Sequence, residues 1–308
     1  MFAPSSCSLA EPALAAHPAA LLLRHAPSVA GAEARLRGVI ADAVHHPGGL
    51  FRLRLVLAIG RAQTVDPEAA GQLAAAVEFF HTASLLFDDL PCMDDAAERR
   101  GRPCAHIEHG DAAALLGALA FINRGYALVA EATAVLPFHL RTQATRALDT
   151  HLGPAGLVGG QARDLAYAHG PRSPRAVGRA AQGKTVALLR LTLLLPALAG
   201  GSSEWELQLL HRLAVYWGQL YQGLDDLRDL RLAAATGSAK SDGRDLALSR
   251  PNLALAAGLD ATRPRLSRLE RLAARTLQEL LACGRRWSVL LLFHRQLAAP
   301  LDEVLALR

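Results

Sequence analysis

The sequence predicts an all-α fold that consists of one helical domain. Alanine, leucine and arginine dominate the composition while β-branched and aromatic residues are sparse, which favours helices over strands. Apolar residues recur at helical spacing along most of the chain. The pattern holds no alternation of strands with helices, no fixed repeat and no low-complexity linker, so a single helical bundle is expected to bury the core.

The expected elements divide the chain into residues 1–30 and residues 31–308. The first segment is rich in Ala, Pro and Ser and is expected to be weakly structured. The second is expected to be the helical domain. Its helices are predicted at 32–45, 50–63, 67–88, 112–136, 141–152, 161–167, 173–199 and 205–232, with three more in 251–308. Polar loops are expected at 94–110 and 235–245.

Proline and glycine account for the expected ends of these helices. Residues 47–49 are Pro-Gly-Gly and separate the first two helices. Pro67 suits the first turn of the third helix, and Pro91 should end or bend it. Further breaks are expected near Gly183, Gly258, Pro264 and Gly284.

Charge and cysteine content restrict the partners and the compartment. The net charge of +5 is spread along the chain, which suits a small anionic substrate, and no dense basic run with aromatics indicates nucleic acid. Cysteines 7, 92, 104 and 283 form no C-x-x-C pair, so free thiols in the reducing cytoplasm are expected. We see no signal-peptide pattern, and the apolar run 191–201 is shorter than the roughly 20 residues that span a membrane.

Two clusters of aspartates lie at or near the ends of apolar helices. The first is Asp88-Asp89-Leu-Pro-Cys-Met-Asp94-Asp95, and the second is Asp225-Asp226-Leu-Arg-Asp229. Like charges at i and i+4, such as Asp225 and Asp229, are destabilising unless a cation neutralises them. Since Pro91 disfavours a straight helix, the chain can turn and present Asp94 beside Asp88.

Hard oxygen ligands in this number suit Mg²⁺, which binds through carboxylates together with substrate phosphates. Two facing clusters are therefore expected to hold a diphosphate through bridging magnesium ions, which stabilise it as a leaving group. A solvated helix end explains a single cluster equally well, but it explains a pair of such clusters poorly.

Basic residues accompany the clusters. Arg99 and Arg100 follow the first one, and arginine geometry favours phosphate oxygens, although pairing with the aspartates is the alternative. Lysine is rare in this chain, so Lys184 and Lys240 are interpreted as functional. His81 lies two turns before Asp88 on nearly the same face, where a packed core histidine is the alternative.

Together these motifs resemble the trans-isoprenyl diphosphate synthase (polyprenyl synthetase) family. HTASLLFDDLPCMDDAAERRGRP resembles its first aspartate-rich motif in the bacterial form, YQGLDDLRD resembles the second, and GGQARDL and GKT fall between them in family order. The match runs with clear motifs from about residue 47 to residue 252. The likeness is closest to bacterial geranylgeranyl diphosphate synthases of carotenoid pathways.

The resemblance implies a helical bundle around a central apolar cavity, a homodimer, and Mg²⁺ as cofactor, with three ions bridging the diphosphate. It also implies a prenyltransferase that condenses an allylic diphosphate with isopentenyl diphosphate to a short-chain trans-prenyl diphosphate, geranylgeranyl diphosphate in particular. The substrate partners are thus the two diphosphates.

The resemblance assigns roles to individual residues. Magnesium ligands are matched by Asp88, Asp94 and Asp225, with Asp89, Asp226 and Asp229 in support. Arg99, Lys184 and Lys240 match residues that hold the allylic diphosphate, and Thr185 and Gln222 match residues that line the allyl group. His81 and Arg100 match residues that hold the diphosphate of isopentenyl diphosphate, and Arg250 stands where the family has a Lys near the diphosphate. The expected catalytic set is Asp88, Asp89, Arg99, Lys184, Thr185, Gln222 and Lys240.

The chain departs from the family pattern in the half of the site that binds the second substrate. The family reads Gly-Gly-Lys-x-Leu-Arg-Pro before the first motif, whereas this chain has GGLFRLRL at 48–55, without the Lys. Arg52 and Arg54 are expected to take the arginine positions. The Gly-Asp pair of the family is also missing from LLGALAF at 115–121. A class I terpene cyclase on the same scaffold therefore stays open, as does, more remotely, a non-catalytic partner subunit.

The length of the product is expected to depend on side chains one turn before Asp88. These side chains are Ala83 and Ser84, and both are small. Side chains at this place on the helix would form the floor of the pocket that holds the growing tail. By resemblance to the family, an aromatic residue at this place limits the product to farnesyl length. The small Ala83 therefore favours a product of geranylgeranyl length. Phe79 and Phe80 lie deeper and are the expected floor.

Overall fold

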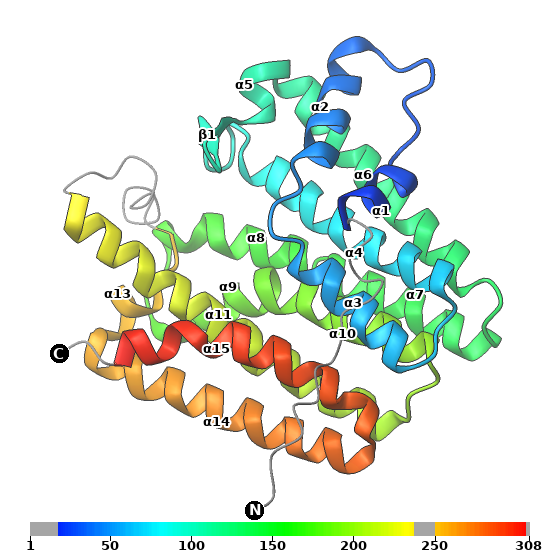
Figure 1. Cartoon of the computed structure of the whole chain (residues 1–308). Coiled ribbons are helices and arrows are strands. Elements are labelled where there is room, and N and C mark those ends of the chain that lie inside the picture. The colour runs from blue at the N-terminus through cyan, green and yellow to red at the C-terminus, as the bar shows by residue number, and fades with distance from the viewer. Residues whose placement is uncertain (1–17, 237–249, 306–308) are drawn as a thin grey trace, which may run out of the picture.

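The computed structural model describes residues 18–236 and 250–305, with side chains described for 18–230 and 250–301. This part of the chain is a helical bundle (Figure 1), which confirms the predicted fold class. Its one small sheet is a hairpin of β1 (Glu98–Arg99) and β2 (Arg102–Pro103), paired antiparallel.

The helices follow one another with short connections. The first half of the chain forms α1 (Pro18–His25), α2 (Ala34–His45), α3 (Phe51–Ala62), α4 (Pro67–Asp88), α5 (Ala105–His109), α6 (Asp111–Thr133) and α7 (Phe138–Leu152). The second half forms α8 (Leu157–Ala166), η1 (Tyr167–His169), α9 (Pro174–Ala181), the π-helical turn η2 (Gln182–Val186), α10 (Ala187–Ala199), α11 (Glu204–Thr236), α13 (Leu253–Ala257), α14 (Leu259–Cys283), η3 (Arg285–Ser288) and α15 (Val289–Leu305).

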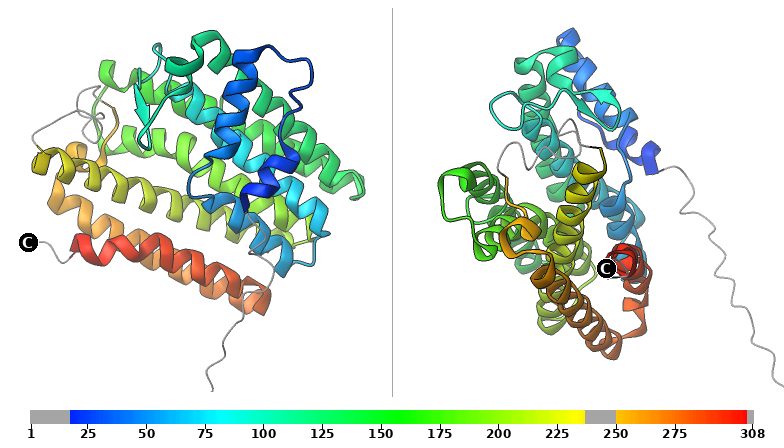
Figure 2. Two further views of the ribbon diagram at one scale, coloured as in Figure 1. Left: turned by 45° about the horizontal axis from the view of Figure 1, so that its top comes forward. Right: turned by 90° about the vertical axis from the view of Figure 1, so that its left-hand side faces the viewer.

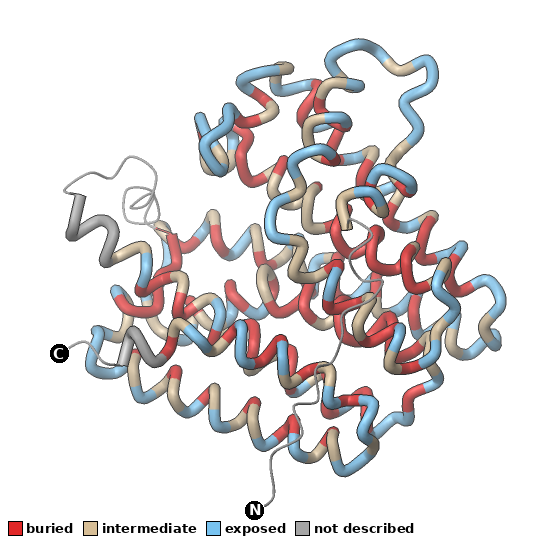
Figure 3. Tube along the Cα trace, in the orientation of Figure 1, coloured by how far each residue is buried: buried red, intermediate tan, exposed pale blue. Residues whose placement is uncertain are grey.

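Helices α3, α4, α10 and α11 form the centre of the bundle, where burial is most complete (Figure 3). The alanines of α4 let α6 pack closely along it, and Phe79 of α4 meets Phe121 of α6 at 5.2 Å between ring centroids. On the opposite side, α14 and α15 run along α11 (Figure 2). The indole Nε1 of Trp217 on α11 donates to Nδ1 of His294 on α15 at 3.1 Å, which fixes this layer to the core.

Helix α4 begins and ends where its sequence indicates. Asp66 caps it by accepting a hydrogen bond from the Ala69 amide at 2.9 Å, and Pro67 occupies its first turn. It ends at Asp88, just before the bend at Pro91. Asp88 and Asp89 of the first cluster are thereby held at the end of a buried helix, and Asp94 and Asp95 follow in the turn after it.

The structure differs from the expected elements at several places. Residues 18–25 of the segment expected to be weakly structured form α1, because Leu22 is buried. The polar loop 94–110 contains the hairpin and α5, and the helix expected at 161–167 begins four residues earlier. Pro264 does not end a helix but lies in the second turn of α14. Because proline has no N–H, the Asp260 carbonyl loses its helical hydrogen-bond donor, but Asp260 is exposed and water can replace that donor.

By length and composition alone, α6 could cross a membrane, and no other helix among the described residues meets that criterion. Part of its apolar surface is buried against α4, and core helices of a bundle meet the same criterion. It therefore gives no clear indication of a membrane span.

Candidate functional site

The two aspartate clusters line one cavity of about 370 Å³. Asp88 and Asp94 reach it from the end of α4 and the loop that follows, and Asp225 and Asp229 reach it from α11. The Asp94 amide donates to the Asp88 carbonyl at 2.9 Å, so the chain turns back after Pro91 as predicted. The carboxylates of the two clusters thus face a common space, which Arg99 and Arg100 of the hairpin also line.

Basic side chains line the same cavity. They are Arg52, Arg99, Arg100, Lys184 and Arg250, with His81 beside them. The ammonium of Lys184 lies 3.7 Å from Oδ2 of Asp88, and Arg250 donates to the carbonyl of Met93 at 2.9 Å and pairs with Asp94. Lys240 lies outside the described residues.

Asp164 on α8 is a site residue that the sequence reasoning did not assign. It lines the cavity, and its Oδ2 lies 3.4 Å from Nζ of Lys184 and 3.7 Å from Nε of Arg250. Burial raises its pKa, while Lys184 and Arg250 oppose that rise. Asp164 is the aspartate of the GGQARDL motif, which lies between the two clusters in the sequence, and this position could have indicated that it belongs to the site.

A contact between two glycines brings Lys184 to Asp164. A Cβ on Gly160 of α8 would lie 2.4 Å from the Gly183 carbonyl carbon, so the two backbones touch without side chains between them. Gly183 belongs to η2, and such π turns re-aim side chains within a helix. The predicted interruption near Gly183 is confirmed, and this turn directs Lys184 and Thr185 to the cavity.

The hairpin directs two arginines into the site. Arg100 and Gly101 both have positive φ, at 57° and 73°, which is the turn geometry that fits a two-residue hairpin. Asp89 holds Arg99 from two sides: Nε donates at 3.0 and 2.9 Å to the two carboxylate oxygens, and Nη2 donates at 2.6 Å. Arg99 and Arg100 both line the cavity as predicted.

Asp89 and Asp226 do not line the cavity, unlike the other four aspartates predicted as magnesium ligands. Neighbouring residues on a helix point about 100° apart, so Asp226 cannot share the direction of Asp225. Oδ2 of Asp226 accepts the Leu253 amide at 2.7 Å, and Oδ1 accepts the amide of Gln222 at 2.9 Å. Asp89 is occupied by Arg99. Both side chains position other residues of the site.

Thr185 and Gln222 form a hydrogen-bonded chain along the wall. The Thr185 hydroxyl donates to Oε1 of Gln222 at 2.9 Å, and the Gln222 amide in turn donates to Asp226. This chain fixes the amide of Gln222 with its oxygen toward Thr185, and both residues line the cavity as predicted.

Of the two arginines near the altered Gly-Gly segment, only Arg52 reaches the cavity. Arg54, which the sequence predicted to bind substrate, is exposed and donates to the Gly49 carbonyl at 3.0 Å, outside the cavity. Residues two apart on a helix point in nearly opposite directions, which explains the difference. Glu78, buried on α4, attracts Arg52 and accepts the Leu53 amide at 3.3 Å. The sequence reasoning did not assign Glu78, although a charged residue within the apolar face of α4 could have indicated a buried partner for an arginine.

His81 and Tyr221 complete this side of the cavity. Burial, followed by the charges of Arg52, Arg100 and Arg99, holds the pKa of His81 well below 6.5. The imidazole is therefore neutral near pH 7 and offers one donor and one acceptor. Tyr221 directly precedes Gln222 in the second motif, and its hydroxyl was missed by the sequence reasoning.

Burial disfavours the charged form of two carboxylates in this cavity. It raises the pKa of Asp88 to about 6, against the opposing attraction of Lys184. Burial also raises the pKa of Asp225. Divalent cations bound between the clusters would stabilise the charged carboxylates, and an all-carboxylate donor set is one that Mg²⁺ accepts. The residues present therefore fit magnesium.

A second, apolar cavity of about 580 Å³ adjoins the first. The two share Ser84, Asp88, Leu157 and Lys184 in their linings, so they meet at the end of α4. Ala83 and Phe80 line the apolar cavity, and Phe80 packs edge-on against Tyr126 at 5.4 Å between centroids. Phe79 does not line it but packs on Phe121 in the core, which corrects its assignment to the floor.

The chain is similar to known proteins of one family. Residues 33–280 match the family model described as polyprenyl synthetase. A geranylgeranyl diphosphate synthase from Pseudescherichia vulneris is 40% identical over 194 residues, which are 63% of this chain and 61% of that protein. Another from Pantoea ananas is 35% identical over 201 residues, 65% of each chain. The matches thus span less than two thirds of these relatives' own lengths.

Solved structures resemble the whole bundle. The apo structure of an FPP/GFPP synthase from Zymomonas mobilis is similar with a TM-score of 0.76 at 28% identity, covering 90% of this chain and 94% of that one. A Helicobacter pylori geranyltransferase, in complex with magnesium and isoprenyl diphosphate, has the same fold with a TM-score of 0.76 at 24% identity, covering 94% of both chains. The family model covers most of the chain, and the protein is accordingly a member of the polyprenyl synthetase family.

Proposed function

We propose that this protein is a magnesium-dependent prenyltransferase that condenses an allylic diphosphate with isopentenyl diphosphate to a short-chain trans-prenyl diphosphate, with geranylgeranyl diphosphate as the product. The observation that carries the proposal is the junction of two cavities, one lined by carboxylates and basic groups and the other apolar. A prenyl diphosphate has two corresponding parts, an anionic diphosphate head and an apolar hydrocarbon tail. Its reacting carbon would lie where the cavities meet, at Asp88.

We assign the magnesium ligands to Asp88, Asp94, Asp225 and Asp229, and propose three ions. When bound, magnesium neutralises the diphosphate and makes it a better leaving group. Lys184, Arg99 and Arg250 bind the oxygens of the allylic diphosphate from the protein side, and Lys240 is assigned to the same group from the family resemblance alone. Asp164 keeps Lys184 and Arg250 in place.

The chain's own residues would then position the reaction and keep it dry. Departure of the diphosphate leaves an allylic cation, which the oxygens of Thr185 and Gln222 stabilise by their dipoles. Arg52, His81 and Arg100 bind the diphosphate of isopentenyl diphosphate, whose double bond attacks the cation. A proton is then lost to the released diphosphate. The apolar lining around Phe80 and Leu157 excludes the water that would trap the cation.

The altered second-substrate half does not require the cyclase alternative. Arg52 supplies a partly buried cation in the cavity beside Arg100 and His81, which compensates for the missing lysine after Gly49. The relatives and structural neighbours carry names of prenyltransferases, which favours chain elongation over cyclisation. A non-catalytic subunit is disfavoured because both clusters contribute carboxylates to one cavity.

The deciding experiment is product analysis with labelled isopentenyl diphosphate, each allylic primer in turn, and magnesium. Incorporation of label into a geranylgeranyl product is expected. Hydrocarbon or alcohol formed from a prenyl diphosphate without isopentenyl diphosphate would instead establish the cyclase. Asp225→Asn serves as a control, since it should weaken either activity at a fixed magnesium concentration.

We further propose a cytoplasmic homodimer. Cys92 and Cys283 are exposed cysteines outside any disulfide, as expected in a reducing compartment. On the solvent side of α6, Leu115, Leu116 and Leu119 are 43, 51 and 48% exposed, an apolar surface suited to a second copy. Leu116→Glu with Leu119→Glu should convert a dimer to a monomer in light-scattering measurements, while a wild-type monomer would contradict the proposal.

A further inference from the structure

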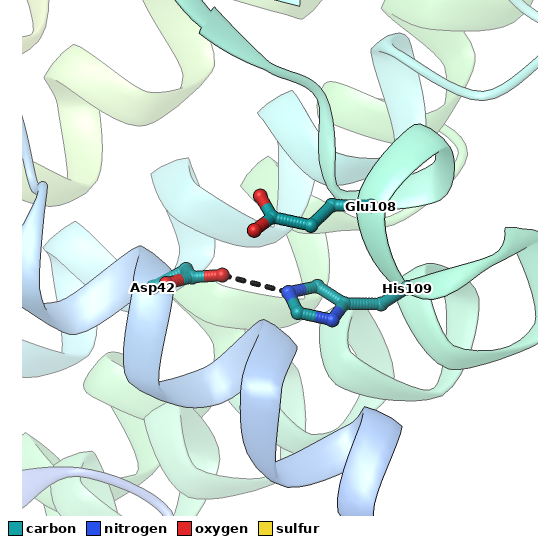
Figure 4. A group of neighbouring side chains, drawn as sticks. All are labelled: Asp42, Glu108 and His109. Carbon is teal, nitrogen blue, oxygen red and sulfur yellow. Dashed lines mark hydrogen bonds and ion pairs between the residues drawn. The ribbon is translucent and has the colours of Figure 1, made fainter.

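A cluster of three potential metal ligands lies outside the substrate cavities, where α5 meets α2. Asp42 belongs to α2, and Glu108 and His109 belong to α5 (Figure 4). One ligand atom from each of them lies within 4.8 Å of the others. None of the three lines the carboxylate cavity or the apolar cavity.

Two of the three ligands are already held in place. Nε2 of His109 lies 2.7 Å from Oδ2 of Asp42. The imidazole also packs on Gly38 of α2 so closely that a Cβ on that glycine would lie 2.5 Å from the ring. The ring orientation is thus fixed by the backbone of α2, with Nε2 directed to the carboxylate. Glu108 is exposed, and its carboxylate faces the same point from one residue earlier (Figure 4).

The chemistry of this set differs from that of the substrate cavity. An imidazole nitrogen with two carboxylates is a donor set for zinc and related transition metals, whereas Mg²⁺ prefers oxygen ligands alone. Two carboxylates balance the charge of a divalent ion, and the partly exposed position leaves room for water as a fourth ligand. We propose that Asp42, Glu108 and His109 bind a divalent transition-metal ion, with zinc as the best fit, and that the ion fastens α5 to α2.

The position of the cluster gives the ion a structural consequence. Helix α5 directly follows the hairpin that carries Arg100, and α2 directly precedes the turn that contains Gly48. That turn touches Arg100, because a Cβ on Gly48 would lie 2.0 Å from its guanidinium. A metal between α2 and α5 therefore links the two chain segments that meet at Arg100, and it should stiffen this corner of the molecule.

The test is titration of the purified full-length protein with Zn²⁺ or Co²⁺ in excess Mg²⁺, which occupies the aspartate clusters. The readouts are calorimetric affinity, the visible absorption of bound Co²⁺ and the midpoint of thermal unfolding. Wild-type protein is expected to bind one ion in this site and to unfold at a higher temperature. Glu108→Gln and Asp42→Asn should weaken binding by at least about tenfold, since even outer-shell changes cost roughly that much.

His139→Gln is the matched control, because His139 is an exposed histidine on α7 away from the cluster, and it should bind metal as the wild type does. The imidazole of His109 packs on α2, so replacing it could disturb the fold as well as the metal site. Glu108→Gln changes only an exposed side chain and should fold normally. Wild-type affinity in Glu108→Gln, or the absence of the cobalt signal in wild-type protein, would overturn the proposal.

Discussion

The Nζ atom of Lys184 lies 3.7 Å from Oδ2 of Asp88, so the π-helical turn η2 meets the end of α4 at the junction of the two cavities. Lys184 also lies 3.4 Å from Asp164. Burial lowers the pKa of this lysine, but Asp88 and Asp164 outweigh burial and raise the pKa overall. Burial nevertheless outweighs Lys184 at Asp88 and raises the pKa of that carboxyl to about 6, so its charged form is disfavoured in the magnesium-free site.

Asp88→Asn should therefore stabilise the magnesium-free protein while it removes activity. The pKa of Asp88 is about 6 in the folded protein against an ordinary 3.8, so its favourable contribution is full below 3.8 and is lost as the pH rises through 6. The uncharged variant should gain on the order of 1–3 kcal/mol of unfolding free energy at about pH 8 and nothing at about pH 4. Denaturant unfolding at both pH values measures this, and a gain that is independent of pH would contradict the burial argument.

Ala83→Tyr should shorten the product. Ala83 lines the apolar cavity next to the carboxylate end, and a phenol ring there would fill the path of the growing tail. The expected product is farnesyl rather than geranylgeranyl diphosphate, with thermal stability nearly unchanged because the ring enters empty space. Chromatography of dephosphorylated products measures the shift, and an unchanged product distribution would refute the pocket assignment.

Phe80→Ala should lengthen the product, since Phe80 and Tyr126 close the apolar cavity. Phe79→Ala is the matched control: the neighbouring ring packs on Phe121 in the core and does not line the cavity. It should cost about 3–5 kcal/mol of stability without changing product length. Equal product distributions from the two variants would show that Phe80 does not limit the tail.

Arg52→Gln should raise KM for isopentenyl diphosphate by about tenfold or more, because a charged donor to the diphosphate is lost. Arg54→Gln, two residues further and exposed, should leave KM unchanged. Because Arg52→Gln also leaves the buried Glu78 without that positive charge, the double variant with Glu78→Gln should recover stability but not KM. Steady-state kinetics and thermal unfolding separate these two effects.

Asp225→Asn and Asp226→Asn should differ although the residues are adjacent. Asp225 lines the cavity, so its loss should raise the magnesium concentration that gives half-maximal activity. Asp226 accepts the Leu253 amide and the Gln222 side chain, so its loss should mainly lower the temperature of unfolding. Magnesium titration of both variants tests whether Asp226 binds magnesium, and equal shifts in half-maximal magnesium would show that it does.

Much of the site could be predicted from residue type and spacing. Helix periodicity, Pro67 and Pro91 predicted both the extent of α4 and the turn that brings Asp94 back to Asp88. Spacing could not decide which of two neighbouring carboxylates or arginines would face the cavity. Asp89, Asp226 and Arg54 point elsewhere, because a helix face is defined only once its neighbours are in place.

The sequence by itself determined the helical fold and the charge chemistry of the two aspartate clusters, because both follow from local periodicity and residue type. Tertiary structure alone decided that Asp164 joins Lys184 and Arg250, since that contact depends on the close approach of Gly160 to Gly183. It also decided that Phe80 and not Phe79 closes the apolar cavity. The physical reason is that contacts between distant segments depend on how whole helices pack, and no short stretch of sequence contains that information.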